Sequence, residues 1–295
     1  MLLKDVLAQG VNILNSSGNE TPVFEAGVIL CHVLKCQKVF LYSHDDYQLN
    51  EREYREYIEA VSKRTNGMPL QYITGHQEFM SLDFKVTSDV LIPRQDTEIL
   101  VETVLEYTKP IKEETIDILD IGTGSGCIAV SLARYIKKSK VVAIDISQKA
   151  LNIAKYNAEK NNVIDKMNFV CGDIFTGLEN ILNKYNEYKN NKKKFDVIVS
   201  NPPYIPSDEI ASLEKQVKDF EPLKALNGGN DGLDFYKFII EDAACFLKKQ
   251  GALALEVGIN QAIDVLKLMQ EKYHNIKIVK DLSGIERVVM GELNY

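Results

Sequence analysis

The chain has 295 residues, of which 45% are hydrophobic, enough to bury one large core or two smaller ones. Its 42 acidic and 35 basic residues give a net charge of -7, which disfavours direct nucleic-acid binding unless a local basic patch overrides it. No apolar run approaches the roughly 18 residues of a membrane helix, the N-terminus lacks a secretion signal, and the five cysteines form no CxxC pair. We therefore expect a soluble protein of the reducing cytoplasm, with no membrane partner.

Residues 1–75 have the pattern of a small helical bundle. Thr21 followed by Pro22 is typical of a helix start, and apolar residues then recur at helical spacing. Asn50 and Glu53 match a capping box at the start of a second amphipathic helix. Because such short helices are marginal alone, we expect them to pack on one another as an N-terminal domain over 1–75.

The pattern changes to a period of two in the next segment, which predicts a linker with short strands or a β-hairpin over 76–94. Pro93 closes this linker, and a helix is predicted within DTEILVETVLEY, residues 96–107. The second domain is then expected over 95–295. The alternating apolar residues of the linker are Phe79, Leu82, Phe84 and Val86.

From about residue 115, short apolar runs alternate with amphipathic stretches, which predicts an α/β fold with a parallel sheet covered on both faces. The last run follows its predecessor after only a short turn, too short for a parallel crossover, so the final strand should be antiparallel to its neighbour. The Lys- and Asn-rich stretch 183–194 is predicted to be a solvated loop. The predicted strands are 116–121, 140–146, 167–173, 195–200, 252–258, 275–281 and 286–293.

A glycine-rich turn follows the first of these strands. The stretch ILDIGTGSGCIAV places Gly122, Gly124 and Gly126 before a helix, where a ligand can approach main-chain N–H groups closely. Asp145 ends the next strand, where a carboxylate suits the two hydroxyls of a ribose. The spacing is G-x-G-x-G rather than the G-x-G-x-x-G of a pyrophosphate site. Together with Asp120 before it, this spacing points to S-adenosylmethionine, a cation without phosphate.

Two further strand ends carry polar groups toward the same edge. Asp173 and Ile174 suit the amino group and ring face of an adenine. The turn SNPPY offers the Asn201 side-chain oxygen and the Pro202 carbonyl as acceptors for the hydrogens of an amide nitrogen, in a turn that prolines stiffen. Tyr204 can stack on a planar group. This turn therefore predicts a planar nitrogen as the methyl acceptor.

These motifs resemble those of class I S-adenosylmethionine-dependent methyltransferases with an (N/D)PPY motif, and more narrowly those of the PrmC/HemK family. The resemblance implies the Rossmann-like seven-stranded sheet of that class, preceded by N-terminal helices that recognise the substrate. It further implies transfer of a methyl group to the side-chain amide of the glutamine in the Gly-Gly-Gln motif of class I peptide-chain release factors. The segments QYITGHQEF, LIPRQDTEILV, ALNGGNDGLDFY, LEVGINQA and DLSGIERVVMG carry it over most of the chain.

One alternative stays open, because similar enzymes methylate the exocyclic nitrogen of adenine or guanine in nucleic acids. The acidic balance and the N-terminal helices count against it. The site residues that the resemblance and the strand ends imply fall into two sets. The cofactor set is Asp120, Gly122, Thr123, Gly124, Ser125, Gly126, Asp145, Asp173, Ile174 and Asn201, and the catalytic and substrate set is Asn201, Pro202, Pro203, Tyr204 and Arg94.

Two residues depart from the family pattern, and two charged residues have alternative roles. Gln95 stands where the family often has Pro, and Ile174 where it often has Trp, which puts an aromatic contact to adenine in doubt. Arg94 and Glu98 either pair with each other and brace the domain junction or line the substrate entry, and Arg287 is expected in a structural ion pair. The histidines show no metal-ligand spacing, so no metal is expected.

Overall fold

The computed structural model describes residues 1–111, 115–183 and 194–294. The chain divides into two compact units, Met1–His76 with Glu214–Phe220, and Gln77–Leu213 with Glu221–Tyr295. The division into an N-terminal domain (1–75), a linker (76–94) and a second domain (95–295), with the roles expected for them, remains a prediction. Apart from its two end residues, the predicted loop 183–194 lies outside the described residues. Within the described part of the chain, no helix has both the length and the apolar character of a membrane span.

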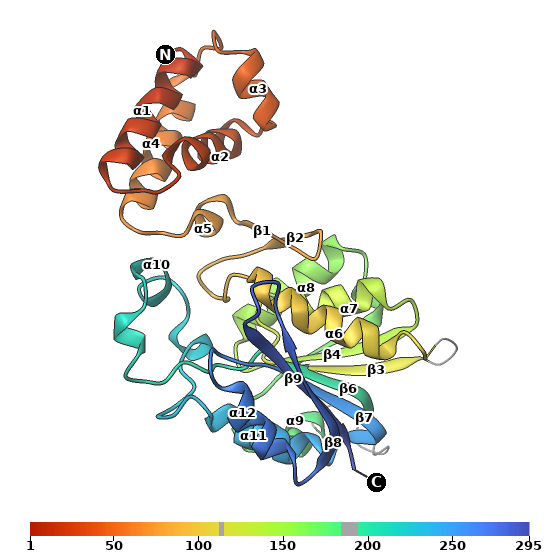
Figure 1. Cartoon of the computed structure of the whole chain (residues 1–295). Helices are drawn as coiled ribbons and strands as arrows, with labels where there is room; N and C mark the ends of the chain where they lie inside the picture. The colour runs from red at the N-terminus through yellow and green to blue at the C-terminus, as the bar shows by residue number, and fades with distance from the viewer. Residues whose placement is uncertain (112–114, 184–193, 295) are drawn as a thin grey trace. The chain divides into compact units, whose positions relative to one another are not determined.

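The first unit consists of helices around one apolar core (Figure 1). Tyr57 is fully buried at its centre, and its hydroxyl donates to the backbone oxygen of Ala26 at 3.4 Å. Gly10 makes room for this ring, because a Cβ there would lie 1.9 Å from the Tyr57 hydroxyl oxygen. The helices are α1 (Leu3–Ser16), α2 (Pro22–Leu34), α3 (Lys38–Ser43), α4 (Glu51–Thr65), α5 (Leu70–Thr74) and α10 (Lys215–Lys218).

Local signals set the ends of two of these helices. The predicted capping box of α4 is confirmed: the Glu53 N–H donates to Asn50 Oδ1 at 2.9 Å, and the Asn50 N–H donates to Glu53 Oε2 at 2.9 Å. Thr21 does precede α2, but its side chain makes no capping hydrogen bond. A buried ion pair joins α2 to α4, since Arg64 donates to both carboxylate oxygens of Glu25 at 2.5 and 3.1 Å.

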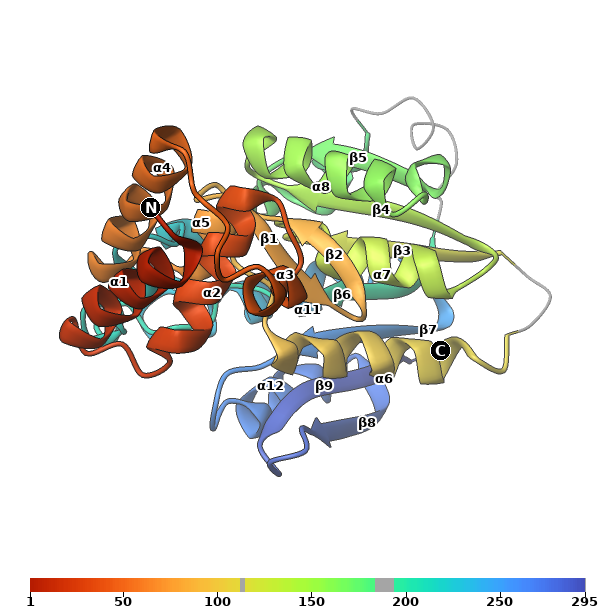
Figure 2. The same cartoon turned by 90° about the horizontal axis from the view of Figure 1, so that it is seen from above.

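The second unit is built on a seven-stranded sheet with the order β5-β4-β3-β6-β7-β9-β8 (Figures 1 and 2). The first five strands in this order are parallel, and β9 runs antiparallel to both β7 and β8. This confirms the predicted fold class and the antiparallel last strand. The strands are β3 (Ile116–Ile121), β4 (Ser139–Asp145), β5 (Met167–Cys171), β6 (Phe195–Ser200), β7 (Leu247–Glu256), β8 (Tyr273–Lys280) and β9 (Glu286–Leu293).

Helices cover both faces of this sheet (Figures 1 and 2). Successive strand residues point to opposite faces, so Ile118 joins the core under α6, α7 and α8, while Leu119 joins the core with α9, α11 and α12. Because both faces are buried, the strands are almost wholly apolar. The helices are α6 (Glu98–Thr108), α7 (Cys127–Tyr135), α8 (Gln148–Lys160), α9 (Leu178–Leu182), α11 (Asp234–Ala243) and α12 (Ala262–Met269).

The predicted hairpin before the sheet is present as β1 (His76–Phe79) and β2 (Leu82–Lys85). Its inner face carries Phe79 and Phe84, which are buried. Asn157 of α8 binds the end of β2: its Oδ1 accepts from the Lys85 N–H at 2.8 Å, and its Nδ2 donates to the Lys85 carbonyl at 3.0 Å. The same Nδ2 also donates to the Ser125 carbonyl at 2.8 Å, which ties the hairpin to the glycine-rich turn.

One helix is shorter than its sequence pattern indicates. The stretch 235–249 is amphipathic over its whole length, but α11 ends at Ala243 and β7 already begins at Leu247. The register between β6 and β7 shifts between Phe195 and Val197, and Gln250 has a φ of 62°. The polar residues 248–250 at the start of β7 interrupt the apolar run, so the sequence alone predicted the strand only from residue 252.

We predict that Asn50→Ala lowers the opening free energy of the α4 amides by about 1 kcal/mol, because the variant leaves an N-terminal N–H of the helix without its acceptor. Native-state hydrogen exchange on the full chain measures this. Arg52→Ala, which removes only an exposed pair with Glu56, serves as the control and should cost less than about 0.5 kcal/mol. Equal protection in the wild type and in Asn50→Ala would contradict the prediction.

Candidate active site

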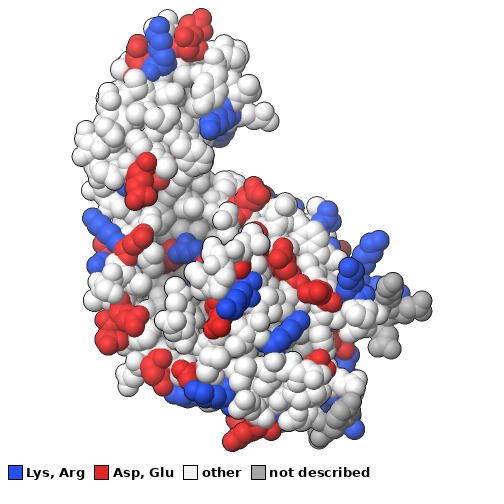
Figure 3. Space-filling model, in the orientation of Figure 1, with Lys and Arg blue, Asp and Glu red and all other residues white. Residues whose placement is uncertain are grey.

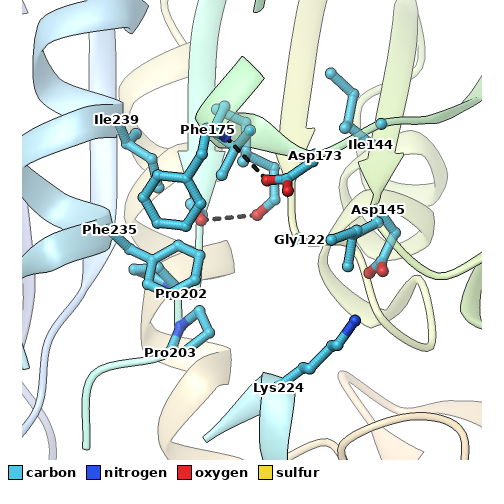
Figure 4. Close-up of a pocket in the computed structure, with 15 residues that line it drawn as sticks. Gly122, Ile144, Asp145, Asp173, Phe175, Pro202, Pro203, Lys224, Phe235 and Ile239 are labelled. Atoms are coloured by element: carbon cyan, nitrogen blue, oxygen red, sulfur yellow. Dashed lines mark hydrogen bonds between the residues drawn. The ribbon is translucent and has the colours of Figure 1, made fainter. Parts of the chain in front are cut away.

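A cavity of about 340 Å³ opens at the carboxyl edge of the sheet (Figure 4). From β3 the chain continues to β4 and β5 on one side, whereas β6 and the later strands lie on the other. The cavity therefore lies at a topological switch point, where open α/β sheets bind ligands. Its walls are Ile121, Gly122, Ile144, Asp145, Ile146, Gly172, Asp173, Ile174, Phe175, Ser200, Pro202, Pro203, Lys224, Phe235 and Ile239.

The glycine-rich turn forms one wall of this cavity. Gly122 has a φ of 74°, and a Cβ there would meet no atom within 4 Å, so the backbone is open to a ligand. The N–H groups of Gly122 and Thr123 both donate to the Ile144 carbonyl at 2.9 Å, which holds the turn against β4. Gly126, with a φ of 82°, lets α7 pack on α8, because a Cβ there would lie 3.0 Å from the Ala154 Cβ.

Asp145 lies beside Gly122 on the same wall (Figure 4). Its Oδ2 accepts from the Gly124 N–H at 2.8 Å and its Oδ1 from the Ser147 N–H at 2.8 Å. Burial raises the pKa of this carboxyl, and the backbone hydrogen bonds oppose that shift. A fixed carboxylate edge thus faces the cavity, ready to accept hydrogen bonds from hydroxyl groups.

Asp120 and Ser125 lie behind the turn and not on the cavity wall. Asp120 is fully buried, and its Oδ2 accepts from the Thr123 hydroxyl at 2.6 Å. Burial raises the pKa of Asp120 to about 7. Ser125 is also buried, and its carbonyl accepts the hydrogen bond from Asn157. These two residues support the shape of the turn from beneath.

The third strand end provides an acid and an aromatic side chain. Asp173 Oδ1 accepts from the Phe175 N–H at 3.0 Å, and Phe175 reaches the cavity beside Asp173 (Figure 4). Ile174 lines the same cavity. The Phe175 ring lies 4.8 Å from that of Phe235 and 5.3 Å from that of Phe238. Sequence reasoning missed Phe175, Phe235 and Lys224 as cavity residues. The only signal was an aromatic residue next to Ile174.

The turn after β6 supplies the opposite wall through Pro202 and Pro203 (Figure 4). A backbone clamp holds this turn: a Cβ on Gly228 would lie 2.7 Å from the Tyr204 Cα, and one on Gly232 would lie 2.3 Å from the Tyr204 carbonyl oxygen. The segment ALNGGNDGLDFY thus contacts the turn directly, which explains its glycines. Hydrogen bonds between Ile205 and the backbone at 226–228 continue the clamp.

Tyr204 and Asn201 do not line this cavity. The Tyr204 carbonyl accepts from Gln261 Nε2 at 2.9 Å, and burial raises the pKa of its hydroxyl. The Asn201 Nδ2 donates to the Thr97 Oγ1 at 3.2 Å. Hydrogen bonds from the Thr97 and Asn201 side chains to the buried Glu256 carboxyl lower its pKa, but burial outweighs them and raises that pKa to about 7.

The predicted pairing of Arg94 with Glu98 is wrong. The Arg94 Nη2 binds the buried Glu221 carboxylate at 2.5 Å, while Glu98 Oε1 accepts from the Met80 N–H at 2.5 Å. Glu221 and Glu98 therefore bind partners that are distant in sequence. The local sequence pattern could not predict these partners. The structural ion pair of Arg287 is confirmed, with Asp96 at 2.6 Å and Asp281 at 2.9 Å.

Comparison with known proteins decides the family. Residues 5–75 match the PrmC N-terminal domain and residues 112–271 match a methyltransferase domain. The release factor glutamine methyltransferase of Moorella thermoacetica is 41% identical over 293 residues, which cover 99% of this chain and 98% of that protein. The protein of the same name from Clostridium acetobutylicum is 38% identical, with coverage of 99% and 98%. The chain belongs to the release factor glutamine methyltransferase family.

Solved structures agree with this methyltransferase at the level of the fold. The human methyltransferase 10 domain containing protein has a TM-score of 0.53 and 18% identity, covering 84% of this chain and 100% of that one. The hMettl16 catalytic domain, solved with the MAT2A 3'UTR hairpin 6, has a TM-score of 0.55 and 16% identity, covering 83% of each chain. Proteins of this class generally use S-adenosylmethionine, in keeping with the matched methyltransferase domain.

We predict that this methyltransferase loses stability relative to an Asp120→Asn variant as pH rises through about 7. The folded-state pKa of Asp120 is raised above its ordinary value of 3.8, so the favourable protonated form is fully present only at low pH and is lost as the group ionises. Thermal and chemical unfolding of both proteins between about pH 5 and 8 should show a relative loss of at least about 1 kcal/mol. A stability difference that is constant with pH would contradict this.

Proposed function

We propose that this methyltransferase transfers the methyl group of S-adenosylmethionine to the side-chain amide nitrogen of the glutamine in the Gly-Gly-Gln motif of class I peptide-chain release factors. The observation that carries the proposal is the clamped turn Asn201-Pro202-Pro203-Tyr204, whose two prolines line a cavity that has a glycine turn and a fixed carboxylate on its other wall. Family membership gives the substrate class, since the named relatives are release factor glutamine methyltransferases.

The cavity suits S-adenosylmethionine in its chemistry. When bound, this molecule supplies an electrophilic methyl group on a positively charged sulfur. The open backbone at Gly122 leaves space that any side chain would fill, and Asp145 presents an oxygen edge for ribose hydroxyls. Asp173 and Asp145 place negative charge beside a cationic ligand. Apolar walls for a purine ring come from Ile144, Ile146, Ile174, Phe175, Phe235 and Ile239.

Phe175 supplies an aromatic ring next to Ile174, the position at which the family often has Trp. The adenine contact proposed for Ile174 would be apolar only, but Phe175 lies next to it in the same wall and is 47% exposed. Its contacts with Phe235 and Phe238 hold the ring in place. We propose that Phe175 takes the aromatic part of the adenine contact.

The amide nitrogen that receives the methyl group must be oriented, and it needs little acid–base catalysis. An amide nitrogen is a weak nucleophile, and two acceptors for its hydrogens fix it in position. The Asn201 side-chain oxygen and the Pro202 carbonyl are the proposed acceptors. As the new carbon–nitrogen bond forms, the carbon–sulfur bond breaks, and the product amide loses one proton to solvent. No general base is required on this chain.

Two further assignments complete the proposal. The N-terminal helices, matched to the PrmC N-terminal domain, would bind the release factor outside its Gly-Gly-Gln loop. Arg94, half-exposed and held by Glu221, would contact the substrate near the turn. On the face drawn in Figure 3, Lys and Arg side chains are interspersed with Asp and Glu, which gives a polyanion no continuous basic field.

Incubation of the enzyme with purified release factor and S-adenosylmethionine should add one methyl group to the glutamine of the Gly-Gly-Gln peptide, detected by mass spectrometry. Two variants should separate the two halves of the site. Asp145→Asn should weaken S-adenosylmethionine binding by roughly 10-fold or more in calorimetry, because the ribose loses a charged acceptor. Asn201→Ala should keep that affinity and lose transfer by roughly 100-fold.

A release factor with glutamate in place of the target glutamine is the substrate control and should stay unmodified. Methylation of adenine or guanine in added RNA or DNA, with none on the release factor, would overturn the proposal in favour of a nucleic-acid methyltransferase. Transfer by Asn201→Ala at the wild-type rate would show that the assigned acceptor role of Asn201 is wrong.

A further inference from the structure

We infer that Glu256 is a positioning residue for methyl transfer: together with Thr97 it holds the Asn201 amide so that the oxygen, and not the nitrogen, faces the methyl acceptor. This inference rests on the proposed function and deepens it. Glu256 ends β7, Thr97 precedes α6, and Asn201 follows β6. The three residues come from separate parts of the chain and meet only in the folded second unit.

The contacts of Asn201 are one-sided. Its Nδ2 donates to the Thr97 Oγ1 at 3.2 Å, and burial raises the pKa of the neighbouring Glu256 carboxyl while the nearby Thr97 and Asn201 side chains lower it. The nitrogen end of the Asn201 amide is thereby directed toward Thr97. Among the described residues, none is seen to donate to Asn201 Oδ1, and the side chain is only partly buried. Its oxygen is therefore available to an incoming group.

The orientation of this amide decides what it can bind. A primary amide is nearly symmetric in shape, but one end only accepts hydrogen bonds and the other only donates. With the oxygen outward, Asn201 accepts from an acceptor N–H. With the amide reversed, two donors would face each other, and the substrate nitrogen would lose both a partner and its orientation.

Glu256 is placed to exclude the reversed amide. Its side chain is fully buried, and its Oε2 has no hydrogen-bond partner among the described residues. An ionised carboxylate is an acceptor only, so it can bind the Asn201 nitrogen but never its oxygen. A protonated carboxyl could donate to that oxygen and allow the reversed orientation.

The charged surroundings of Glu256 come from several elements. Arg287 of β9 lowers the pKa of its carboxyl and Asp96 raises it, while burial is the largest effect. Tyr204, Tyr236 of α11 and Cys127 of α7 also lie within electrostatic reach. Arg287 remains bound to Asp96 and Asp281 without Glu256, so replacement of Glu256 leaves no isolated buried cation.

Glu256→Leu and Thr97→Val test the inference, because each removes one acceptor of the Asn201 nitrogen while keeping an apolar side chain of similar bulk. Each should lower kcat for methyl transfer to the release factor by at least about 10-fold and change S-adenosylmethionine affinity by less than about 2-fold, a margin of roughly 0.4 kcal/mol. Glu256→Gln carries donors as well as an acceptor, so it permits the reversed amide and should have the lower rate of the wild type with Glu256 protonated.

A double-mutant cycle shows whether Glu256 acts through Asn201. In an Asn201→Ala background, adding Glu256→Leu should change the residual rate by less than about 2-fold, since no amide remains to be oriented. The wild-type rate should rise with pH through about 7 as Glu256 ionises, and Glu256→Gln should lack this rise.

The control variant is Asp196→Asn. Asp196 is a carboxylate at the opposite end of β6, where it binds Lys248 at 2.8 Å, and its replacement should leave kcat unchanged. Two results would overturn the inference. One is a double variant Asn201→Ala/Glu256→Leu whose loss of transfer rate equals the product of the two single losses. The other is a wild-type kcat in both Glu256→Leu and Thr97→Val. Failure of the proposed function differs from these results, because the wild type itself would then leave the release factor unmodified.

Discussion

The close approach of the turn after β6 and the backbone segment 226–232 is the constraint on which the rest of the site depends. A Cβ at Gly228 would lie 2.7 Å from the Tyr204 Cα, and one at Gly232 would lie 2.3 Å from the Tyr204 carbonyl oxygen. The clamp fixes the backbone, and the prolines remove most of the remaining freedom in φ. A single rigid corner can therefore place two cavity-wall prolines, an amide and an aromatic ring at once.

The sheet brings this corner to the cofactor side of the site. Parallel strands end at one edge, so the glycine turn after β3, Asp145 after β4 and Asp173 after β5 reach the same cavity as the turn after β6. The carboxyl groups differ in burial. Asp145 keeps an edge toward the cavity, whereas Asp120 and Glu256 are buried, which raises the pKa of each to about 7, and Asp120 accepts a hydrogen bond from Thr123.

Much of the fold could be predicted from the sequence, because β3, β6 and β9 are apolar runs with polar or glycine boundaries, and their predicted and observed ends coincide. The start of β7 could not, since the polar residues 248–250 interrupt its apolar run. Of the predicted site residues, Gly122, Asp145, Asp173, Ile174, Pro202 and Pro203 line the cavity, whereas Asp120, Ser125, Asn201 and Tyr204 do not. Phe175, Thr97 and Glu256 were missed because their roles arise only from tertiary neighbours. The Arg94 partner was missed for the same reason, as Glu221 lies 127 positions away.

The central claim is that the clamped backbone of the turn, and not the cofactor cavity alone, makes this chain a methyltransferase for a planar amide. Gly228→Ala tests it most directly, with single-turnover transfer to release factor measured beside S-adenosylmethionine affinity on the same preparation. Displacement of Tyr204 and Pro203 by the new methyl group should lower the transfer rate by roughly 100-fold, a far greater change than in affinity. A variant that folds and transfers the methyl group at the wild-type rate would contradict the account.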